Sequence, residues 1–540
     1  MKIVSEIRGI SDPYSAKKAI VKQTINANQL EADDISADVI IIGTGAGGGT
    51  SAEILAQAGL KVLMIEEGPL KSTRDFKMDE QKAYADLYQE SAGRATKDGG
   101  IGILQGRCVG GTTVINWTSS FRTPSPTLDY WQKTFQVQGC SHSDMIPWFE
   151  QMEKRLNITP WHGVNENNTV LKEGCEKLNI PWKAIPRNVK GCWNLGYCGM
   201  GCPTNAKQSM LVTTIPDALE HGATLLYQAR VERLLIKNSK VTGVECIAYD
   251  EHKQKTSKKI IAKAPYIILA GGAINGPALM LRSNAPDPNK RIGKRTFLHP
   301  TVFSFAQFDK EISPFYGAPQ SIYSDHFQWK NGTTGPLGYK LEVPPLHPAI
   351  SSIMLMGHGN SHVADMAKLN NTHAMLALLR DGFDDDSEGA SITLADNGSP
   401  IVDYPMNDYL FDGIKRAYLS MAEVQFAAGA KKVRPAHQHG QWFESYESFK
   451  KGFTHLEHKV SNNLVGSAHV MGGLAMGENK EVCLVDSHCK YHYLDNLWVF
   501  DGSVFPTSIG TNPQLSIYAL VCKQATKLAK ELGKKQPSSA

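Results

Sequence analysis

The sequence contains no long hydrophobic run, no internal repeat and no block of like charge. Lys and Arg together number 57 against 53 Asp and Glu, which leaves a net charge of +4 spread along 540 residues. Without a basic stretch, the sequence gives no indication of a surface that binds nucleic acid or a strongly anionic membrane. No apolar run approaches the roughly 20 residues of a membrane-spanning helix. We therefore expect neither a nucleic-acid partner nor a transmembrane segment, while peripheral contact with a membrane stays open.

Signal-peptide features are also missing from the sequence. Residues 1–35 form a polar lead-in, in which Lys17, Lys18 and Lys22 interrupt the apolar positions, and they contain no small-residue cleavage site. This favours a cytoplasmic protein, with export by another route left open. The lead-in is expected to cover a sheet. The sequence gives no indication of the oligomeric state.

Cysteine is too scarce for a disulfide scaffold, with 10 residues in 540. Most cysteines are scattered singly, and we interpret these as small buried side chains. Three others are clustered, as Cys192-x5-Cys198-x3-Cys202 followed by Pro203. Clustered thiolates at short spacing can hold an iron–sulfur cluster or zinc, but only three cysteines occur locally. A structural or disulfide role is preferred and no metal site is assigned, while a cluster at these residues stays open.

A glycine loop near the start of the chain predicts binding of a dinucleotide. The apolar run 39–42 reads as a buried parallel strand, and Gly43, Gly45 and Gly48 supply G-x-G-x-x-G where strand turns into helix. Gly43 is expected to make the tight turn and Gly45 to let the backbone approach a pyrophosphate. Gly48 is expected to let the helix pack close to the strand, so that the helix N-terminus faces the phosphates.

The segments after this loop complete a βαβ unit. A helix over 51–58 is stopped by Gly59, and a second strand follows over 61–65. Glu66 then ends the strand about twenty residues beyond the loop, where a carboxylate can accept from both ribose hydroxyls. The presence of both strands, the helix and the terminal acidic residue in this order favours an ADP-binding unit over a plain loop.

Two further glycine-bearing segments suggest contact with a ligand. In the run 106–116, paired glycines precede two threonines, which suits backbone lying against a ligand, although a helix-capping turn explains the threonines about as well. A strand over 264–270 ends in glycines and leads into a helix near 275–277, which repeats the strand–glycine–helix arrangement.

The remaining segments indicate a second structural region. From 301 to 459 aromatics and prolines are frequent and no strand–glycine–helix unit appears, which favours an antiparallel cap. Other expected elements are helical segments over 71–97, 145–156 and 515–531, returning strands within 223–236, a β-hairpin with an Asn-Gly turn over 392–402 and a hairpin-like pair over 484–501.

These blocks, in this order, resemble the glucose–methanol–choline family of FAD-dependent oxidoreductases over nearly the whole chain. Residues 106–116 resemble its first signature, G-R-x-x-G-G-[ST]-[ST]-x-x-N, and residues 272–283 resemble the second. Gly276 and Asn284 depart from that second signature, where Ser or Thr and Gly are usual. Residues 201–209 look like a segment of bacterial long-chain alcohol oxidases and dehydrogenases. The motif H-x-x-G-G after Ala468, in place of H-x-x-G-T, together with Asn512 is closer to the cholesterol-oxidase-like branch of the family.

The resemblance implies an α/β fold, α+β overall. A Rossmann-like FAD-binding domain would be assembled from discontinuous segments and joined to an antiparallel-sheet substrate-binding cap. The expected division is a lead-in (1–35), FAD-binding parts (36–144, 211–300 and 460–535), a cap segment with the cysteine trio (145–210) and a substrate-binding domain (301–459).

The resemblance also implies which residues carry the chemistry. In the family, a His at the position of His469 and a His or Asn at that of Asn512 face the flavin. His469 is the expected base, since imidazole titrates near neutrality, and Asn512 would donate to the substrate oxygen. His299 is expected to be structural or to line the entrance.

Non-covalent FAD is the cofactor that the resemblance implies. Asn116 would contact the isoalloxazine edge, and the preceding Ile115 stands where relatives with covalently attached FAD carry His. Asp501 would orient a turn in which Gly502 and Ser503 bring N–H groups to the pyrophosphate. The expected cofactor-binding residues are Gly43, Gly45, Gly48, Glu66, Gly106, Arg107, Gly110, Gly111, Thr112, Asn116, Val231, Asp501, Gly502 and Pro513.

The predicted function is FAD-dependent oxidation of a hydrophobic alcohol, long-chain or sterol-like, with hydride passing to flavin N5. The electron acceptor stays open between oxygen and a quinone or cytochrome. One alternative is a dehydrogenase that passes electrons through an iron–sulfur cluster at the cysteine trio. A second alternative is a lyase that binds flavin without redox turnover.

Overall fold

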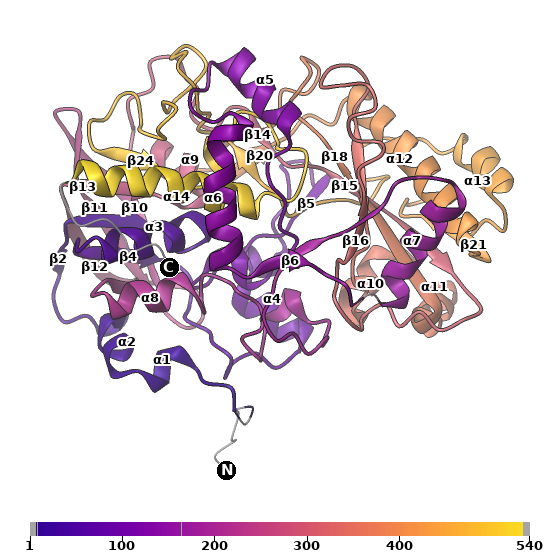
Figure 1. Cartoon of the computed structure of the whole chain (residues 1–540), viewed down its shortest axis with the longest axis horizontal. Coiled ribbons are helices and arrows are strands. Elements are labelled where there is room, and N and C mark those ends of the chain that lie inside the picture. Colours follow the sequence, from indigo (N-terminus) through magenta and orange to yellow (C-terminus); the bar gives the residue numbers. More distant parts are fainter. Residues whose placement is uncertain (1–6, 8, 164, 533–540) are drawn as a thin grey trace.

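The computed structural model describes residues 7, 9–163 and 165–532. In Figure 1 a parallel sheet with its helices occupies the left of the molecule, and a large, mostly antiparallel sheet occupies the right. Each region has its own cluster of buried apolar side chains. The predicted fold class, a Rossmann-like α/β part joined to an antiparallel sheet, is therefore confirmed.

Six parallel strands form the first sheet, in the order β1–β9–β4–β3–β13–β24. Helix α3 packs against β3 and β4, and the four side chains of β3 are at most 7% exposed, as expected for a parallel sheet covered by other elements. The strands are β1 (Thr24–Asn26), β3 (Val39–Ile42), β4 (Val62–Glu66), β9 (Thr224–Tyr227), β13 (Tyr266–Leu269) and β24 (Leu497–Val499).

A second sheet contacts the first through β10 and β11. Three of its strands are antiparallel, and β2 joins β12 in parallel. Its strands are β10 (Ala229–Lys237), β11 (Lys240–Tyr249), β12 (Lys255–Lys263) and β2 (Asp34–Ser36). The segment expected as a polar lead-in thus supplies edge strands to two sheets, β1 and β2.

The third sheet has eight strands in the order β5–β22–β15–β18–β17–β16–β7, with β21 also paired to β15. All pairs are antiparallel except β5 with β22. The strands are β5 (Ile101–Ile103), β7 (Lys183–Ala184), β15 (Thr301–Gln307), β16 (Ile322–Ser324), β17 (Tyr339–Glu342), β18 (Thr372–Leu379), β21 (Lys432–Pro435) and β22 (Val465–Ser467). Two of them, β5 and β22, come from segments expected in the FAD-binding part, so the chain crosses between regions more often than predicted.

Three short strand pairs and the helices complete the fold. The pairs are β6 (Ile158–Pro160) with β8 (Pro186–Asn188), β14 (Thr296–Phe297) with β23 (Met471–Gly472), and β19 (Ser391–Leu394) with β20 (Pro400–Asp403). The α-helices are α1 (Pro13–Ala16), α2 (Lys18–Gln23), α3 (Ala46–Gln57), α4 (Glu80–Leu87), α5 (Ser125–Phe135), α6 (His142–Arg155), α7 (Glu166–Lys177), α8 (Thr214–Glu220), α9 (Gly272–Arg282), α10 (Pro348–Met354), α11 (Gly359–Ala367), α12 (Asp408–Ala427), α13 (Tyr446–Phe453) and α14 (Gln514–Glu531).

Several sequence-based expectations need correction. The first helix begins at Ala46 rather than near residue 51, because Gly47, Gly48 and Gly49 are helical and pack closely against neighbouring segments. Within 71–97 the only α-helix is α4. The segment 484–501 contains the expected hairpin-like pairing only as isolated antiparallel bridges, Val485 with Tyr491 and Lys490 with Trp498, while its strand β24 also pairs in parallel with β13. The 20-residue helix α12, which packs on the third sheet, was not predicted.

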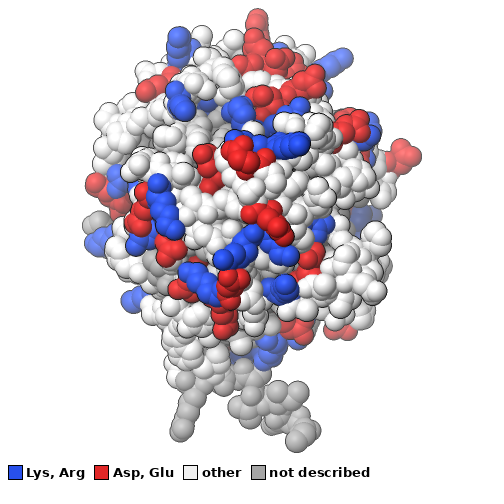
Figure 2. All heavy atoms as spheres, turned by 90° about the vertical axis from the view of Figure 1, so that its right-hand side faces the viewer, with Lys and Arg blue, Asp and Glu red and all other residues white. Residues whose placement is uncertain are grey.

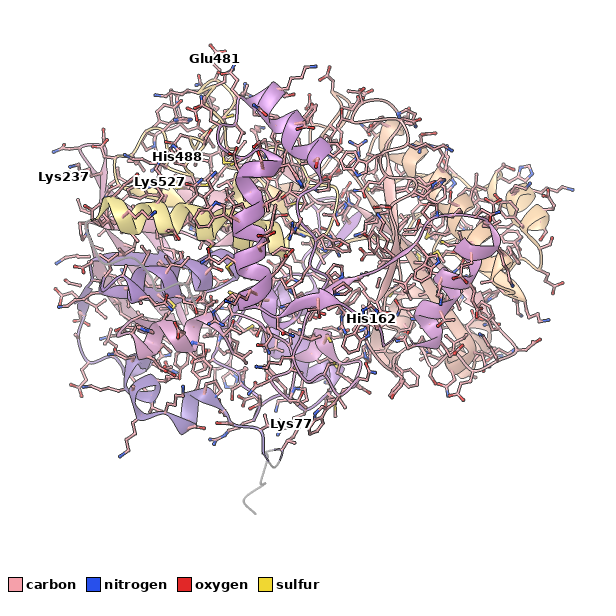
Figure 3. All side chains as sticks on the ribbon, viewed as in Figure 1. Lys77, His162, Lys237, Glu481, His488 and Lys527 are labelled. Carbon is pink, nitrogen blue, oxygen red and sulfur yellow. The ribbon has the colours of Figure 1, made fainter. Side chains whose placement is uncertain are left out.

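The surface agrees with the balanced composition. Figure 2 shows Lys and Arg interspersed with Asp and Glu on the face that carries the right-hand region of Figure 1. Lys77 and Lys237 project from the periphery in Figure 3. Among the helices of the described residues, none combines the length and the apolar character that crossing a membrane requires.

Candidate active site

A cavity of about 360 Å³ lies between the parallel sheet and the antiparallel sheet. It brings together segments from the whole length of the chain, including both ends of the predicted site. The predicted residues that line it are Gly43, Gly45, Glu66, Gly106, Gly111, Thr112, Asn116, Val231, His469, Asp501, Gly502, Asn512 and Pro513. Gly48, Arg107 and Gly110 do not line it.

The glycine loop is shaped by close backbone contacts around one open position. Gly43 has φ +99°, and a Cβ there would lie 2.4 Å from the Ala270 oxygen. A Cβ on Gly48 would lie 2.0 Å from the Gly43 oxygen, so this glycine permits helix packing behind the cavity wall. Around Gly45, in contrast, a Cβ would meet nothing within 4 Å. The loop therefore presents backbone to open space at Gly45.

Gly47 is a further constrained glycine that sequence reasoning missed. A Cβ there would lie 1.6 Å from the Phe500 oxygen, at the end of β24. The motif spacing draws attention to positions 43, 45 and 48, whereas this contact depends on a strand some 450 residues later in the chain. Only the tertiary structure reveals it.

Glu66 ends β4 inside the cavity. Its carboxylate accepts hydrogen bonds from the Thr44 N–H (3.1 Å), the Thr44 hydroxyl (2.7 Å) and the Gly68 N–H (2.9 Å). Burial raises the pKa of Glu66 to about 7, against the lowering effect of these bonds. The carboxyl is thus held in place by the loop, with its position fixed for contact with a ligand.

The neighbouring Glu67 also lines the cavity, although it was not predicted. Gln89 donates to it at 2.6 Å, and Arg107 lies 3.5 Å away. Burial raises the pKa of Glu67, but Arg107 and Arg230, together with the Gln89 hydrogen bond and Arg94, outweigh burial and lower it below its usual value. Arg107 was expected to bind the cofactor directly, whereas its contacts place it behind Glu67 and over the Tyr249 ring.

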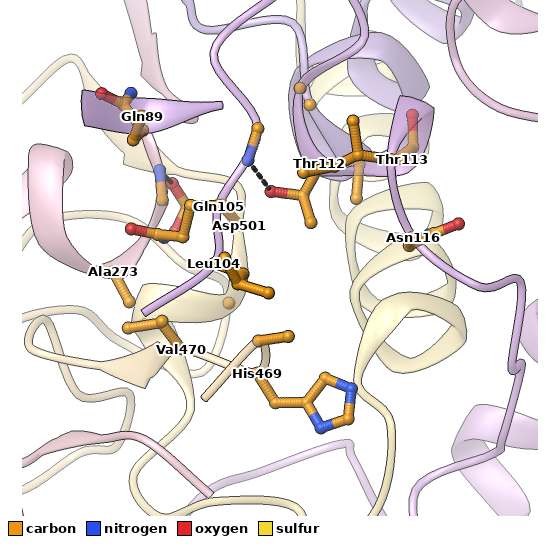
Figure 4. A pocket seen from close by; sticks show the side chains of 18 of the residues that line it. Gln89, Leu104, Gln105, Thr112, Thr113, Asn116, Ala273, His469, Val470 and Asp501 are labelled. Atoms are coloured by element: carbon orange, nitrogen blue, oxygen red, sulfur yellow. Dashed lines mark hydrogen bonds between the residues drawn. The ribbon is translucent and has the colours of Figure 1, made fainter. Parts of the chain in front are cut away.

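The second glycine loop supports the first. The Gly106 N–H donates to Thr112 Oγ1 at 3.0 Å, drawn as a dashed line in Figure 4. The Gly110 N–H donates to the Thr44 hydroxyl at 2.9 Å, which in turn binds Glu66. Gly110 therefore acts through Thr44 and not by lining the cavity.

Asp501 joins the two strand–glycine–helix units. Its carboxylate accepts from the Gly272 N–H at the start of α9 (2.7 Å) and from the Ser503 N–H (2.8 Å). Ser503 does not line the cavity, and its N–H is used by Asp501, so the expectation that it faces a pyrophosphate is wrong. Gly502 does line the cavity.

Asn116 lines the cavity, and Figure 4 shows it on the same side of the view as Thr112 and Thr113. Its amide donates to Gln514 Oε1 at 2.8 Å. Behind it, the buried Lys207 donates to the carbonyls of Val114 and Asn116, each at 2.7 Å. These bonds fix the loop that carries Ile115, which also lines the cavity.

The two predicted catalytic side chains meet at one end of the cavity. Asn512 Nδ2 lies 3.4 Å from His469 Nε2, and His469 Nδ1 lies 3.0 Å from His299 Nδ1. In Figure 4 the His469 imidazole is at the opposite end of the view from Gln89. Burial, and secondarily Lys340, lower the pKa of His469 to about 3, so the ring is neutral at neutral pH.

His299 is fully buried and does not line the cavity, which agrees with a structural position but not with one at the entrance. Two buried residues from β17, Lys340 and Glu342, contact the Asn512 amide. Sequence analysis missed both residues, because nothing near them in the chain resembles a catalytic motif.

The cysteine trio lies behind the Asn116 loop. All ten cysteines are described and none forms a disulfide; these three are partly exposed, whereas the other seven are buried. Cys198 lies 3.7 Å from the fully buried Arg187, and its carbonyl accepts from Lys207. In the described part of the chain, no group of three His, Cys, Asp or Glu side chains is arranged to hold a metal ion.

Comparison with known proteins identifies related sequences. Two models of the GMC oxidoreductase family match residues 84–301 and 386–520, more than half of the chain. A long-chain-alcohol oxidase of Arabidopsis thaliana is 28% identical over 527 residues, covering 93% of this chain and 68% of the relative. An uncharacterised GMC-type oxidoreductase of Sinorhizobium fredii is 28% identical over 514 residues, covering 94% and 97%.

Solved structures share the fold. Pyridoxine 4-oxidase from Mesorbium loti has a TM-score of 0.69 at 16% identity, covering 91% of this chain and 98% of that one. A formate oxidase of Aspergillus oryzae has a TM-score of 0.69 at 14% identity, covering 93% and 99%. The same fold thus occurs with chemically different substrates, so these likenesses indicate the fold and not the substrate.

FAD is the cofactor typical of this family, and the residues of the cavity fit it. The first turns of α3 and α9 both line the cavity, so two helix N-termini can face phosphates. Gly45 leaves space for them, and Glu66 stands at the end of β4 where ribose hydroxyls are bound in such folds. The donor set suits an ADP-linked cofactor.

Proposed function

The chain belongs to the GMC oxidoreductase family, and from this premise we propose that it oxidises a hydrophobic alcohol to the aldehyde or ketone. A single observation carries the proposal: an imidazole and a carboxamide, His469 and Asn512, converge at one end of a cavity whose other walls suit FAD. The flavin, when bound, supplies the acceptor for hydride from the alcohol carbon.

His469 serves as the base in this proposal. Its neutral imidazole keeps one ring nitrogen unprotonated, and a substrate hydroxyl placed between Nε2 and Asn512 can donate its proton there. The Asn512 N–H would donate to the same oxygen and hold it in place. The 3.4 Å separation of the two groups is long for a direct hydrogen bond, and an incoming hydroxyl can replace it.

Apolar side chains from the antiparallel sheet favour a hydrophobic substrate. Phe303 on β15 and Leu376 and Leu378 on β18 line the same cavity as His469. Such a wall favours an alkyl chain or a sterol-like skeleton over a sugar, whose hydroxyls would be left without partners. The likeness to long-chain-alcohol oxidases supports a long-chain alcohol as the first candidate.

The cofactor is proposed to be non-covalent. Ile115 lines the cavity directly before Asn116, and its aliphatic side chain offers no nucleophile for attachment to the ring. Backbone groups of the glycine loops and the Glu66 carboxylate would then hold FAD without a covalent bond.

An anaerobic flavin-reduction screen tests the function. Purified protein with FAD is mixed without oxygen with primary alcohols of increasing chain length, and with a sterol, a sugar and an aromatic alcohol. We expect bleaching of the flavin absorbance, fastest with long-chain alcohols. If no alcohol bleaches the flavin, the redox-silent lyase gains and the oxidation proposal fails. Admission of air after reduction then separates an oxidase, which reoxidises rapidly, from a dehydrogenase.

A second candidate is a dehydrogenase that passes electrons through the cysteine trio. Two buried cations next to Cys198, Arg187 and Lys207, have no carboxylate partner among the described residues, and Arg187 leaves Nε and Nη1 without a hydrogen bond. Uncompensated buried charge favours an anionic group such as thiolates holding iron and sulfide. The described thiols are not arranged as a metal site, which counts against this candidate. Iron and sulfide analysis of anaerobically purified protein decides it.

A further inference from the structure

We propose that the buried Lys340–Glu342 pair fixes the orientation of the Asn512 amide, and through it the tautomer of His469, so that both are positioning residues for alcohol oxidation. The inference rests on the proposed function, because it concerns the same two catalytic side chains. Neither residue touches the cavity itself, and each would act only through Asn512.

The pair is placed by strand geometry. Lys340 and Glu342 are two residues apart on β17, so their side chains lie on the same face of the sheet. Their charged atoms are 2.8 Å apart, and the side chains are 1% and 0% exposed. The Lys340 Nζ also lies 3.1 Å from the centre of the Phe121 ring.

Each member of the pair contacts a different atom of the Asn512 amide. Lys340 Nζ donates to Asn512 Oδ1 at 3.2 Å, and Asn512 Nδ2 donates to Glu342 Oε2 at 3.2 Å. Lys340 Nζ also donates to the Thr511 hydroxyl at 2.9 Å, which holds the ammonium against the same turn. An ammonium can only donate and an ionised carboxylate can only accept, so only one orientation of the amide satisfies both.

The fixed amide determines which nitrogen of His469 carries the proton. Asn512 Nδ2 is the atom that faces His469 Nε2, so Nε2 must be the acceptor and the neutral ring carries its proton on Nδ1. That proton points at His299 Nδ1, 3.0 Å away. The lone pair needed to accept a substrate proton is therefore presented toward Asn512 and the cavity.

Stability does not explain this pair. Burying two charges costs several kcal/mol in desolvation, and well-packed apolar residues commonly replace such pairs without loss of stability. A buried pair that touches both ends of one amide is better explained by the single orientation it imposes. The alternative orientation would place Oδ1 beside Glu342 and beside His469 Nε2, which removes the lone pair from the cavity side.

The charge of Lys340 makes the arrangement dependent on pH. Burial lowers the pKa of Lys340 to about 8, against the raising effect of Glu342. The other titratable groups that influence or face it are Asp325, Lys183, Tyr323, His299 and His469. Below about pH 8 the ammonium and the Glu342 carboxylate together fix the amide. Above about pH 8 the amine is neutral and no longer discriminates, so Glu342 alone favours this orientation and the amide is held less firmly.

The tautomer can be measured in the wild-type protein. Long-range proton–nitrogen spectra of protein labelled with ¹⁵N-histidine distinguish Nδ1–H from Nε2–H rings, and the His469 signals are assigned by their loss in His469→Asn. We expect the Nδ1–H tautomer in the wild type and a mixture of tautomers in Glu342→Gln, whose amide both donates and accepts. A wild-type ring protonated on Nε2 overturns the inference, whatever the variants do.

Kinetics provide the second test. In anaerobic flavin reduction, Glu342→Gln is expected to be about tenfold slower or more, with unchanged FAD affinity. For the wild type we expect the rate to fall above about pH 8, and Lys340→Arg, which stays charged, to move this fall to higher pH. Asp365→Asn is the matched control, since Asp365 pairs with Arg434 and does not line the cavity.

The outcomes separate the two proposals. If no alcohol reduces the flavin of the wild type, the proposed function fails, while the tautomer measurement still decides the positioning role. If the wild type is reduced but Glu342→Gln and Lys340→Arg match it in rate and pH profile, the positioning role is contradicted and the function stands.

Discussion

His299 and His469 meet through their Nδ1 atoms, 3.0 Å apart, so the two rings share one proton on this axis. Burial lowers the pKa of both rings, that of His469 to about 3 and that of His299 well below its ordinary value. Both rings are therefore neutral at neutral pH, and one Nδ1 must accept from the other. His299 is itself held by its backbone N–H, which donates to the Asp381 carboxylate at 3.2 Å.

Replacing His299 tests this contact. His299→Leu removes the acceptor for the His469 proton, and we expect flavin reduction to slow about tenfold, as for loss of one buried hydrogen-bond partner worth roughly 1–3 kcal/mol. His299→Gln, whose side-chain oxygen can still accept, should keep more of the rate. The comparison is made by stopped-flow reduction with FAD content matched. Equal rates of flavin reduction in His299→Leu and His299→Gln would show that the hydrogen bond between His299 and His469 does not affect the reaction.

Two glycines of the first loop should respond in opposite ways to a single methyl group. Gly45→Ala adds a Cβ into open space at φ −67°, so the apoprotein should keep its stability to within about 0.5 kcal/mol, while FAD binds more weakly. Gly47→Ala places a Cβ 1.6 Å from the Phe500 oxygen and should destabilise the apoprotein by about 2 kcal/mol or more. Urea unfolding of apoprotein and FAD titration measure both effects. Unchanged FAD affinity in Gly45→Ala contradicts a pyrophosphate at this position.

Glu66 should make the stability of the apoprotein depend on pH. Burial raises its pKa in the folded state to about 7, above the model-compound value of 4.5. Between these values the folded state holds the proton more tightly than the unfolded state, so stability falls as pH rises through this window. Relative to wild type, Glu66→Gln should gain up to about 3 kcal/mol between pH 4.5 and 7. Urea unfolding of both apoproteins at several pH values measures this difference, and a pH-independent difference contradicts the prediction.

A non-covalently bound FAD should separate from the protein when the protein is denatured in acid. After acid precipitation the flavin should remain in the supernatant, because neither Ile115 nor Asn116 supplies a nucleophile to the ring. Ile115→His places an imidazole at that cavity position and provides the comparison, since any attachment would carry colour into the pellet. Flavin in the wild-type pellet contradicts the proposal.

Much of the cofactor side was predictable because its signals are local. Gly43, Gly45 and Glu66 lie within one βαβ unit, where spacing along the chain determines proximity in space. His469 and Asn512 were located by motif resemblance, and both line the cavity. The pair expected over 484–501 is present as isolated antiparallel bridges. The additional parallel pairing of β24 with β13 could not be predicted, because a short apolar run looks the same whether its partner is a neighbour or a distant strand.

The supporting residues of the site could not be read from the sequence. Lys340 and Glu342 form an alternation of charged residues on a strand, which ordinarily indicates a solvent-exposed face, yet both are buried. Their partner Asn512 is some 170 residues away in the chain. His299 and His469, which also contact each other, are separated by a similar number of residues. The charge pair becomes part of the site only because β17 lies beside the turn that carries Asn512.

The most direct test of the account is anaerobic reduction of FAD-loaded wild type and His469→Asn by the alcohol that reduces the wild type fastest. General-base catalysis by a positioned side chain contributes about 100-fold or more, so the variant should bind FAD normally and bleach at least about 100 times more slowly. A variant that bleaches at the wild-type rate contradicts the assignment of His469 as the base.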